Sequence, residues 1–207
     1  MTREVLRARL ERALRPALSP EAAAWLGRAR EKIAGDPGAA AVLLPAAGRR
    51  CGRGPLPDPP GWTADDAARV AMLLELPCTG DVLAARLADL YRHGDAQERR
   101  GVLRSLDALG AEAGDAALPL LHDALRSNDS RLVAAALGPY AAARLPGPAW
   151  RQAVLKCAFT GVPLAVVAGL GERADAELTR MMSDYARERT AAGRDVPPDV
   201  ARFLEAR

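Results

Sequence analysis

The feature that most constrains the fold is a helical spacing of apolar residues, repeated in short segments that Gly, Pro or Asp interrupts. From residue 81 to residue 140, apolar side chains recur at every third or fourth position, which is the spacing of one buried helix face. Because the interruptions are short, consecutive helices are expected to lie antiparallel. We predict an all-α fold of antiparallel helical hairpins, stacked either as a HEAT-like α-solenoid or as a compact helical bundle. The stripes are Leu83, Leu87 and Leu90; Val102, Leu106 and Leu109; Leu118, Leu121 and Leu125; and Leu132, Val133, Ala136, Leu137 and Tyr140.

Capping signals place helices before and after this region. Thr2 is expected to start a helix that reaches about Arg15, and Ser19-Pro20 a second helix that reaches about Ala34. A third helix is expected from Asp36-Pro37 to about Gly48, and a later one from Thr63. The side chains expected to be buried in the first two helices are Val5, Leu6, Leu10, Leu14, Trp25, Leu26 and Ile33.

Near the carboxyl end, the pattern predicts a corner, one long helix and a short terminal one. Gly161 is expected to take a positive φ, and Pro163 to begin a short helix. The long helix is expected over residues 172–192. We divide the chain into residues 1–60, with N-terminal helices and an Arg/Pro-rich loop, and residues 61–207, a HEAT-like body, together forming one continuous domain.

The composition excludes several classes of protein. The net charge is +3, and acids interleave with arginines, so a nucleic-acid binder is disfavoured. The arginines of the first helix, Arg3, Arg7, Arg9, Arg12 and Arg15, are expected to form a solvated face, with a surface for an anionic partner as the alternative.

Metal sites and membrane spans are also disfavoured. Cys51, Cys78 and Cys157 are isolated, so a disulfide framework or a zinc site is not expected. With only 2 histidines, another transition-metal site is not expected either, and we predict no cofactor. The first residues lack the apolar stretch of a signal peptide, and no apolar run approaches the roughly 20 residues of a membrane span. We therefore expect a cytoplasmic protein.

Polar residues between positions 129 and 156 could form a ligand pocket between helices. The candidates are Asp129, Arg131, Tyr140, Arg151 and Lys156. A partly desolvated lysine could act as a base or an amine nucleophile. In the alternative interpretation, Asp129 only caps a helix, Arg131 pairs with it, and Lys156 extends its ammonium group out of an apolar face.

Two further sets of charged residues need an interpretation. Arg49 and Arg50 stand beside glycines and are candidates for binding a phosphate or carboxylate, with an Arg-bearing linker as the alternative. Asp65 and Asp66 superficially resemble the metal-binding aspartates of helical prenyl-diphosphate enzymes. The third acid of that motif is replaced by Arg69, so we interpret both aspartates as first-turn capping carboxylates.

Several blocks of the sequence resemble the EboA family. They cover residues 48–50, 91–100, 126–133, 138–140 and 150–163, and the last, Trp-Arg-Gln-Ala-Val-Leu-Lys-Cys-x-Phe-Thr-Gly-Val-Pro, is the most specific. Members are typically encoded beside a UbiA-type membrane prenyltransferase, a TatD-like metal hydrolase and a sugar-phosphate-cyclase-like protein. The resemblance implies a role with a polyprenyl-linked or cyclitol-type precursor. It carries over no catalytic residue.

Three functions follow, in order of preference. The first is a non-catalytic accessory protein of secondary metabolism, which binds a neighbouring pathway enzyme (prenyltransferase-type or metal hydrolase) or a phosphorylated small molecule. The second is a cryptic enzyme or small-anion binder that uses the polar pocket. The third is a helical-repeat nucleic-acid binder, which would show steeply salt-dependent binding.

Overall fold

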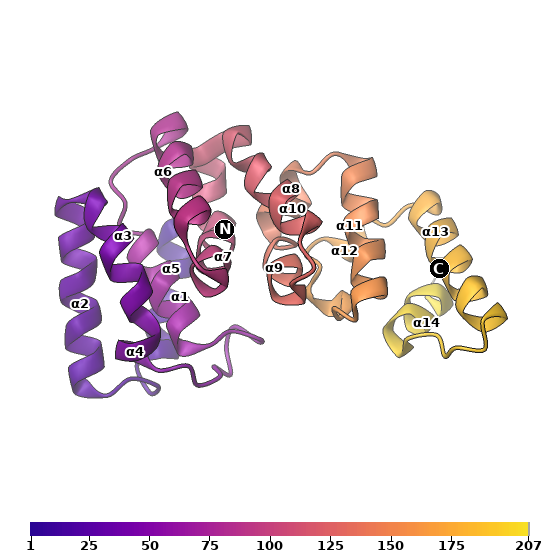
Figure 1. The fold of residues 1–207 in the computed structure, drawn as a ribbon, viewed down its shortest axis with the longest axis horizontal. Helices are drawn as coiled ribbons and strands as arrows, with labels where there is room; N and C mark the ends of the chain where they lie inside the picture. Colours follow the sequence, from indigo (N-terminus) through magenta and orange to yellow (C-terminus); the bar gives the residue numbers. More distant parts are fainter. Residues whose placement is uncertain (207) are drawn as a thin grey trace. The chain divides into compact units, whose positions relative to one another are not determined.

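A computed structural model describes residues 1–206 and confirms the all-α prediction (Figure 1). Within these residues the regular structure is helical, and β-pairing is limited to an isolated bridge between Pro55 and Thr63. The chain forms two compact units, one from Met1 to Leu120 and one that begins at Leu121.

The first two helices of the first unit begin where the capping signals predict. Thr2 and Ser19 each accept a hydrogen bond from a backbone N–H in the first turn of the helix that follows, as expected of N-cap residues. Asp95 and Glu98 form a complete capping box. The helices are α1 (Arg3–Leu14), α2 (Pro20–Gly35), α3 (Ala40–Leu43), α4 (Ala47–Cys51), α5 (Ala64–Leu73), α6 (Gly80–His93) and α7 (Ala96–Ala113).

Helix α5 forms the centre of this unit. All its residues are buried, and α1, α2, α4 and α7 pack against it. A helix that is buried on every side requires apolar residues all round or paired polar ones. The predicted division between residues 60 and 61 stays a prediction, although α5 and the helices that precede residue 60 pack together within this unit.

The second unit is built around α11, and the boundary between the units falls in the first turn of α8. Trp150, Val154 and Cys157 of α11 are buried, and α9, the 3₁₀ turn η4 and α13 pack against this helix. Gly161 ends α11 with a φ of 70°, which confirms the predicted positive φ. The helices are α8 (Leu118–Arg126), α9 (Ser130–Ala135), α10 (Pro139–Arg144), α11 (Gly147–Thr160), α12 (Leu170–Arg173), α13 (Ala176–Ala191) and α14 (Pro198–Glu205), and η4 covers Leu164–Val166.

Three predicted helices are interrupted in the structure. The helix predicted from Asp36-Pro37 to about Gly48 is divided into two 3₁₀ turns and the short helices α3 and α4, and Pro45 lies at the start of the second turn. The apolar stripe from Leu132 to Tyr140 is divided between α9 and α10, because Gly138 is extended and Pro139 starts a new helix. The helix predicted over residues 172–192 begins later, because Asp175 is extended and caps α13 by accepting a hydrogen bond from Leu178 N–H.

The prediction of a solvated arginine face on α1 is wrong for Arg3 and Arg7, whose contacts are part-buried, whereas the pair of Arg9 is exposed. Arg3 donates to the carbonyl oxygens of Leu74, Leu76 and Cys78 and forms an ion pair with Glu112. Arg7 pairs with Glu75, and Arg9 with Asp58. Arg12 and Arg15 are exposed, as predicted.

In α1 and α2, two apolar side chains expected to be buried are not fully buried, and in the predicted stripe of α8 the same holds for Leu118 and Leu125. Val5 is 58% exposed because it lies on the outer face of α1, and Trp25 is only half-buried. The other side chains predicted to be buried in α1 and α2 are buried.

Candidate functional site

Asp129 and Arg131 make the contacts expected if Asp129 caps a helix and Arg131 pairs with it. Asp129 is the N-cap of α9 and accepts a hydrogen bond from the backbone N–H of Arg131. The Arg131 guanidinium donates to both carboxylate oxygens of Asp129, at 3.0 and 2.7 Å. These hydrogen bonds from Arg131 hold the pKa of Asp129 below its ordinary value. The Arg131 side chain is 57% exposed, so this ion pair is largely solvated.

The other predicted pocket residues make separate contacts. Arg151 forms an ion pair with Asp175 at 2.7 Å, next to the start of α13. Lys156 donates to the carbonyl oxygens of Leu125 and Ser127, at 2.6 and 2.8 Å. Tyr140 is buried in α10. The contacts of Arg151 and Lys156 lie at different helix ends, and the joint role of the predicted residues in one pocket stays a prediction.

Lys156 does line a groove within the second unit. One wall is a face of α8 that includes His122, Leu125 and Arg126, and the other is a face of α11 that includes Gln152 and Lys156. The groove has a volume of about 350 Å³, at the lower end of the range of roughly 300–1,000 Å³ for small-molecule pockets. Of its lining residues, only Lys156 was predicted to belong to a ligand pocket, and Leu125 was predicted to be part of a buried stripe.

Arg49 and Arg50 lie on the short helix α4 and are exposed. The neighbouring Gly48 carries no side chain where the Arg53 guanidinium passes: a Cβ at Gly48 would lie 3.0 Å from Arg53 Nε. Their role in binding an anion stays a prediction.

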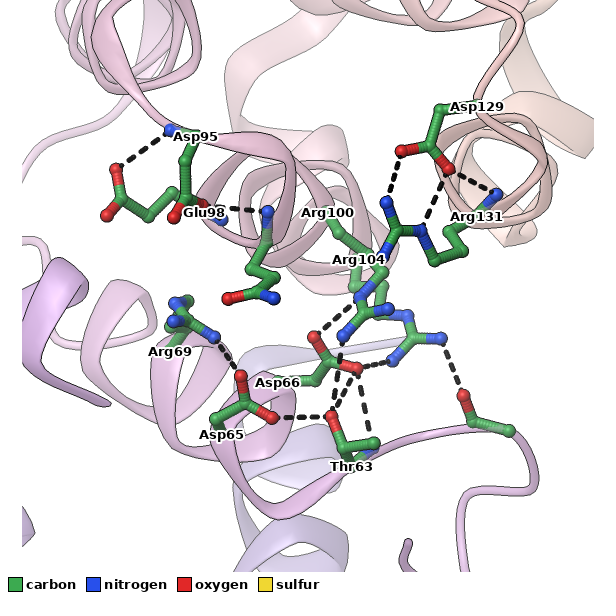
Figure 2. Close-up of polar contacts among 12 residues, drawn as sticks. Thr63, Asp65, Asp66, Arg69, Asp95, Glu98, Arg100, Arg104, Asp129 and Arg131 are labelled. Atoms are coloured by element: carbon green, nitrogen blue, oxygen red, sulfur yellow. Dashed lines mark hydrogen bonds and ion pairs between the residues drawn. The ribbon is translucent and has the colours of Figure 1, made fainter. Parts of the chain in front are cut away.

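A buried ionic cluster in the first unit was not predicted from the sequence (Figure 2). Arg69 Nη1 pairs with Asp65 Oδ2 at 2.6 Å, and both side chains are almost fully buried. Asp66, also buried, lies between Arg100 and Arg104 of α7 and pairs with both. Burial opposes ionisation of Asp65, but hydrogen bonds from Thr63 and Arg69 outweigh it and lower its pKa.

The capping interpretation of these aspartates is confirmed for Asp66 and incomplete for Asp65. Asp66 accepts a hydrogen bond from the backbone N–H of Thr63 at 3.3 Å, which caps the start of α5. Asp65 is instead the ion-pair partner of Arg69, one helical turn later. The spacing of four residues between them was a usable signal, because an arginine inside an otherwise apolar helix needs a partner.

Buried sulfur atoms offer no ready nucleophile. Burial, with a contribution from Asp199, raises the pKa of the Cys157 thiol to about 12. Burial likewise raises the pKa of Cys51 to about 11, with Asp65 nearby. Both thiols are therefore protonated near neutral pH, and the thiolate is the nucleophilic form.

The sequence profile of the family described as "Metabolite traffic protein EboA" matches residues 54–205, most of the chain. The chain belongs to the EboA family. A search of curated proteins found no match, and no solved structure matches.

The EboA match covers both walls of the groove and the five predicted pocket residues, whereas Arg49 and Arg50 precede it. It also covers the ionic cluster of Asp65, Asp66, Arg69, Arg100 and Arg104. Within residues 1–206 no group of His, Cys, Asp and Glu side chains has a geometry that could hold a metal ion. None of the helices described is long and apolar enough to cross a bilayer.

Proposed function

We propose that this EboA protein binds a small metabolite and releases it chemically unchanged. The observation that carries the proposal is the open groove between α8 and α11, which lies in the part of the chain that matches the metabolite-traffic family. A groove on the surface of one unit allows a ligand to enter and leave without opening the fold. We further propose that the ligand is a polyprenyl-linked or cyclitol-type precursor, passed to or from a prenyltransferase-type or metal-hydrolase partner.

The contacts of the candidate reactive groups support binding rather than catalysis. Lys156 uses its ammonium group to hold the carbonyl end of α8, and the Asp129 carboxylate is occupied by Arg131 and by the start of α9. Catalytic acids, bases and nucleophiles need a side chain that can approach the reacting atom. Because Lys156 and Asp129 are held by hydrogen bonds at helix ends, they are less free to approach a reacting atom.

For the fold, we propose the HEAT-like stacking of helical hairpins over a closed bundle. Helices α6 and α7 pack together and are joined at Gly94 and Asp95, as expected of one hairpin of such a stack. Stacked hairpins leave binding surfaces along the faces of neighbouring helices.

The test is a thermal-shift screen of the whole protein against prenyl diphosphates, sugar phosphates and free cyclitols. A specific ligand should stabilise the folded state by about 2.7 kcal/mol at a concentration of 100 times its Kd. Mass spectrometry of the ligand after prolonged incubation should then recover it unchanged. Conversion of the ligand to a product would contradict the proposal in favour of an enzyme, and binding of none of the compounds would contradict it outright.

A further inference from the structure

We infer that the groove between α8 and α11 binds the phosphate group of a small phosphorylated metabolite. This inference rests on the proposed function, because it names the chemistry of the ligand at the same groove. Three observations support it: the faces of α8 and α11 that line the groove, the positive charge of the lining side chains, and the apolar surface of the groove.

The lining residues lie on single faces of two helices. His122, Leu125 and Arg126 of α8 stand at positions i, i+3 and i+4, and Ala149, Gln152, Ala153 and Lys156 of α11 at i, i+3, i+4 and i+7. Residues with these spacings are neighbours on a helix surface. The groove is therefore built by regular secondary structure, which holds its side chains at fixed positions.

The charge of the lining favours an anion. Arg126 and Lys156 are cationic, and the lining contains no carboxylate. Most arginines of the ionic cluster and of α1 pair with aspartate or glutamate, whereas neither Arg126 nor Lys156 forms an ion pair with any residue in the described part of the chain. A phosphate would supply the negative charge that these two side chains lack.

Lys156 has a donor to spare for this purpose. An ammonium group carries three donors, and the carbonyl oxygens of Leu125 and Ser127 take two of them. Those carbonyls lie at the carboxyl end of α8, where the helix dipole is negative and would repel an anion. The lysine charge offsets that repulsion. The net interaction of an anion with the groove is therefore set by the Arg126 guanidinium and the third donor of Lys156.

The remaining lining residues indicate a small ligand body. Ala149 and Ala153 have short side chains and, with Leu125, form an apolar surface, while the Gln152 amide and the His122 ring can bond hydroxyl groups. The volume of about 350 Å³ fits a phosphate ester of a sugar or cyclitol size better than a long polyprenyl chain.

The inference is tested by calorimetric titration of the whole protein with inositol 1-phosphate, glucose 6-phosphate, inorganic phosphate and neutral inositol. The phosphate esters should bind, and neutral inositol should bind at least about tenfold more weakly, because it lacks the charge-assisted hydrogen bonds. Raising the salt concentration from about 50 to about 500 mM should weaken binding of the esters, since the site is open to solvent.

Arg126→Gln is the decisive variant, and Arg194→Gln is its matched control. Both arginines are exposed and both changes remove one positive charge, but only Arg126 lines the groove. The first change should weaken binding of the esters by about tenfold to a hundredfold, and the second by less than about twofold. Far-ultraviolet circular dichroism should show that both variants keep the helical fold.

The outcomes separate the inference from the proposed function. If the wild-type protein binds no phosphate ester, or if Arg126→Gln binds esters as tightly as the wild type, the inference is overturned. In either case, binding of a neutral metabolite in the thermal-shift screen would leave the proposed function standing. Failure of every metabolite would overturn both.

Discussion

Replacing Arg69 by Met should strongly destabilise the first unit, because the change leaves a buried carboxylate without its main partner. The Arg69 side chain is 2% exposed and that of Asp65 is 1% exposed. Arg69 Nη1 lies 2.6 Å from Asp65 Oδ2, and Arg69 Nε donates to the carbonyl oxygen of Leu44 at 3.2 Å. Met fills a similar length of side chain, so the change removes the charge and donors more than the packing.

The expected loss is about 3–5 kcal/mol, the usual cost of removing one partner of a buried ion pair. Thr63 still holds Asp65, with Oγ1 at 2.6 Å from Asp65 Oδ1, which favours the lower half of that range. With a urea m-value of about 2 kcal/mol/M, the unfolding midpoint should fall by roughly 1.5–2.5 M. Far-ultraviolet circular dichroism measures the transition.

Two further variants decide between a lost ion pair and a general loss of packing. Asp65→Leu together with Arg69→Met removes both charges, and should be more stable than Arg69→Met alone. Arg131→Met breaks the exposed pair with Asp129 and should cost no more than about 1 kcal/mol. A loss below about 1 kcal/mol for Arg69→Met, or a double variant less stable than that single one, would refute the reasoning.

Two other predictions concern the same region of the fold. Gly101→Ala should cost about 1–3 kcal/mol in urea unfolding, because the new Cβ would lie 2.9 Å from Arg69 Cβ, whereas Gly27→Ala, with open space around it, should cost nothing for this reason. Thermal stability should be steady from about pH 7 to pH 5 and fall below about pH 4, because the pKa of Asp65 is lowered in the folded protein. The ionised form of Asp65 stabilises the fold at pH values above its pKa in the unfolded chain, and this stabilisation is lost as the pH drops through its pKa in the folded protein. A rise in melting temperature on acidification below about pH 4 would contradict the predicted pH dependence.

Helix starts could be predicted from the sequence because the interactions that fix them are local. Ser19 accepts a hydrogen bond from the N–H of Ala22, and Thr2 accepts one from the N–H of Val5. The end of α11 at Gly161 is equally local, because the positive φ depends on the residue itself. Such features need only a few consecutive residues.

Contacts between segments that are distant in the chain could not be predicted from the sequence. Arg3 and Glu112 are 109 positions apart, and nothing in either neighbourhood indicates that they meet. The groove shows the same limit, since Arg126 and Lys156 belong to helices separated by α9 and α10. Lys156 could be predicted as a candidate because a lysine in an apolar stretch is unusual, whereas a charged residue at a helix end, such as Arg126, is common.

The side chain of Arg3 has a consequence for where an EboA folding unit begins. The family match starts at residue 54, but the carbonyl oxygens of Leu74, Leu76 and Cys78, which lie inside the match, accept hydrogen bonds from Arg3, which lies outside it. A protein trimmed to residues 54–205 would lose these donors and expose the face of α5 that α1 and α2 cover. In this chain, the stretch that matches the family is therefore shorter than the stretch that covers α5 and supplies the Arg3 donors.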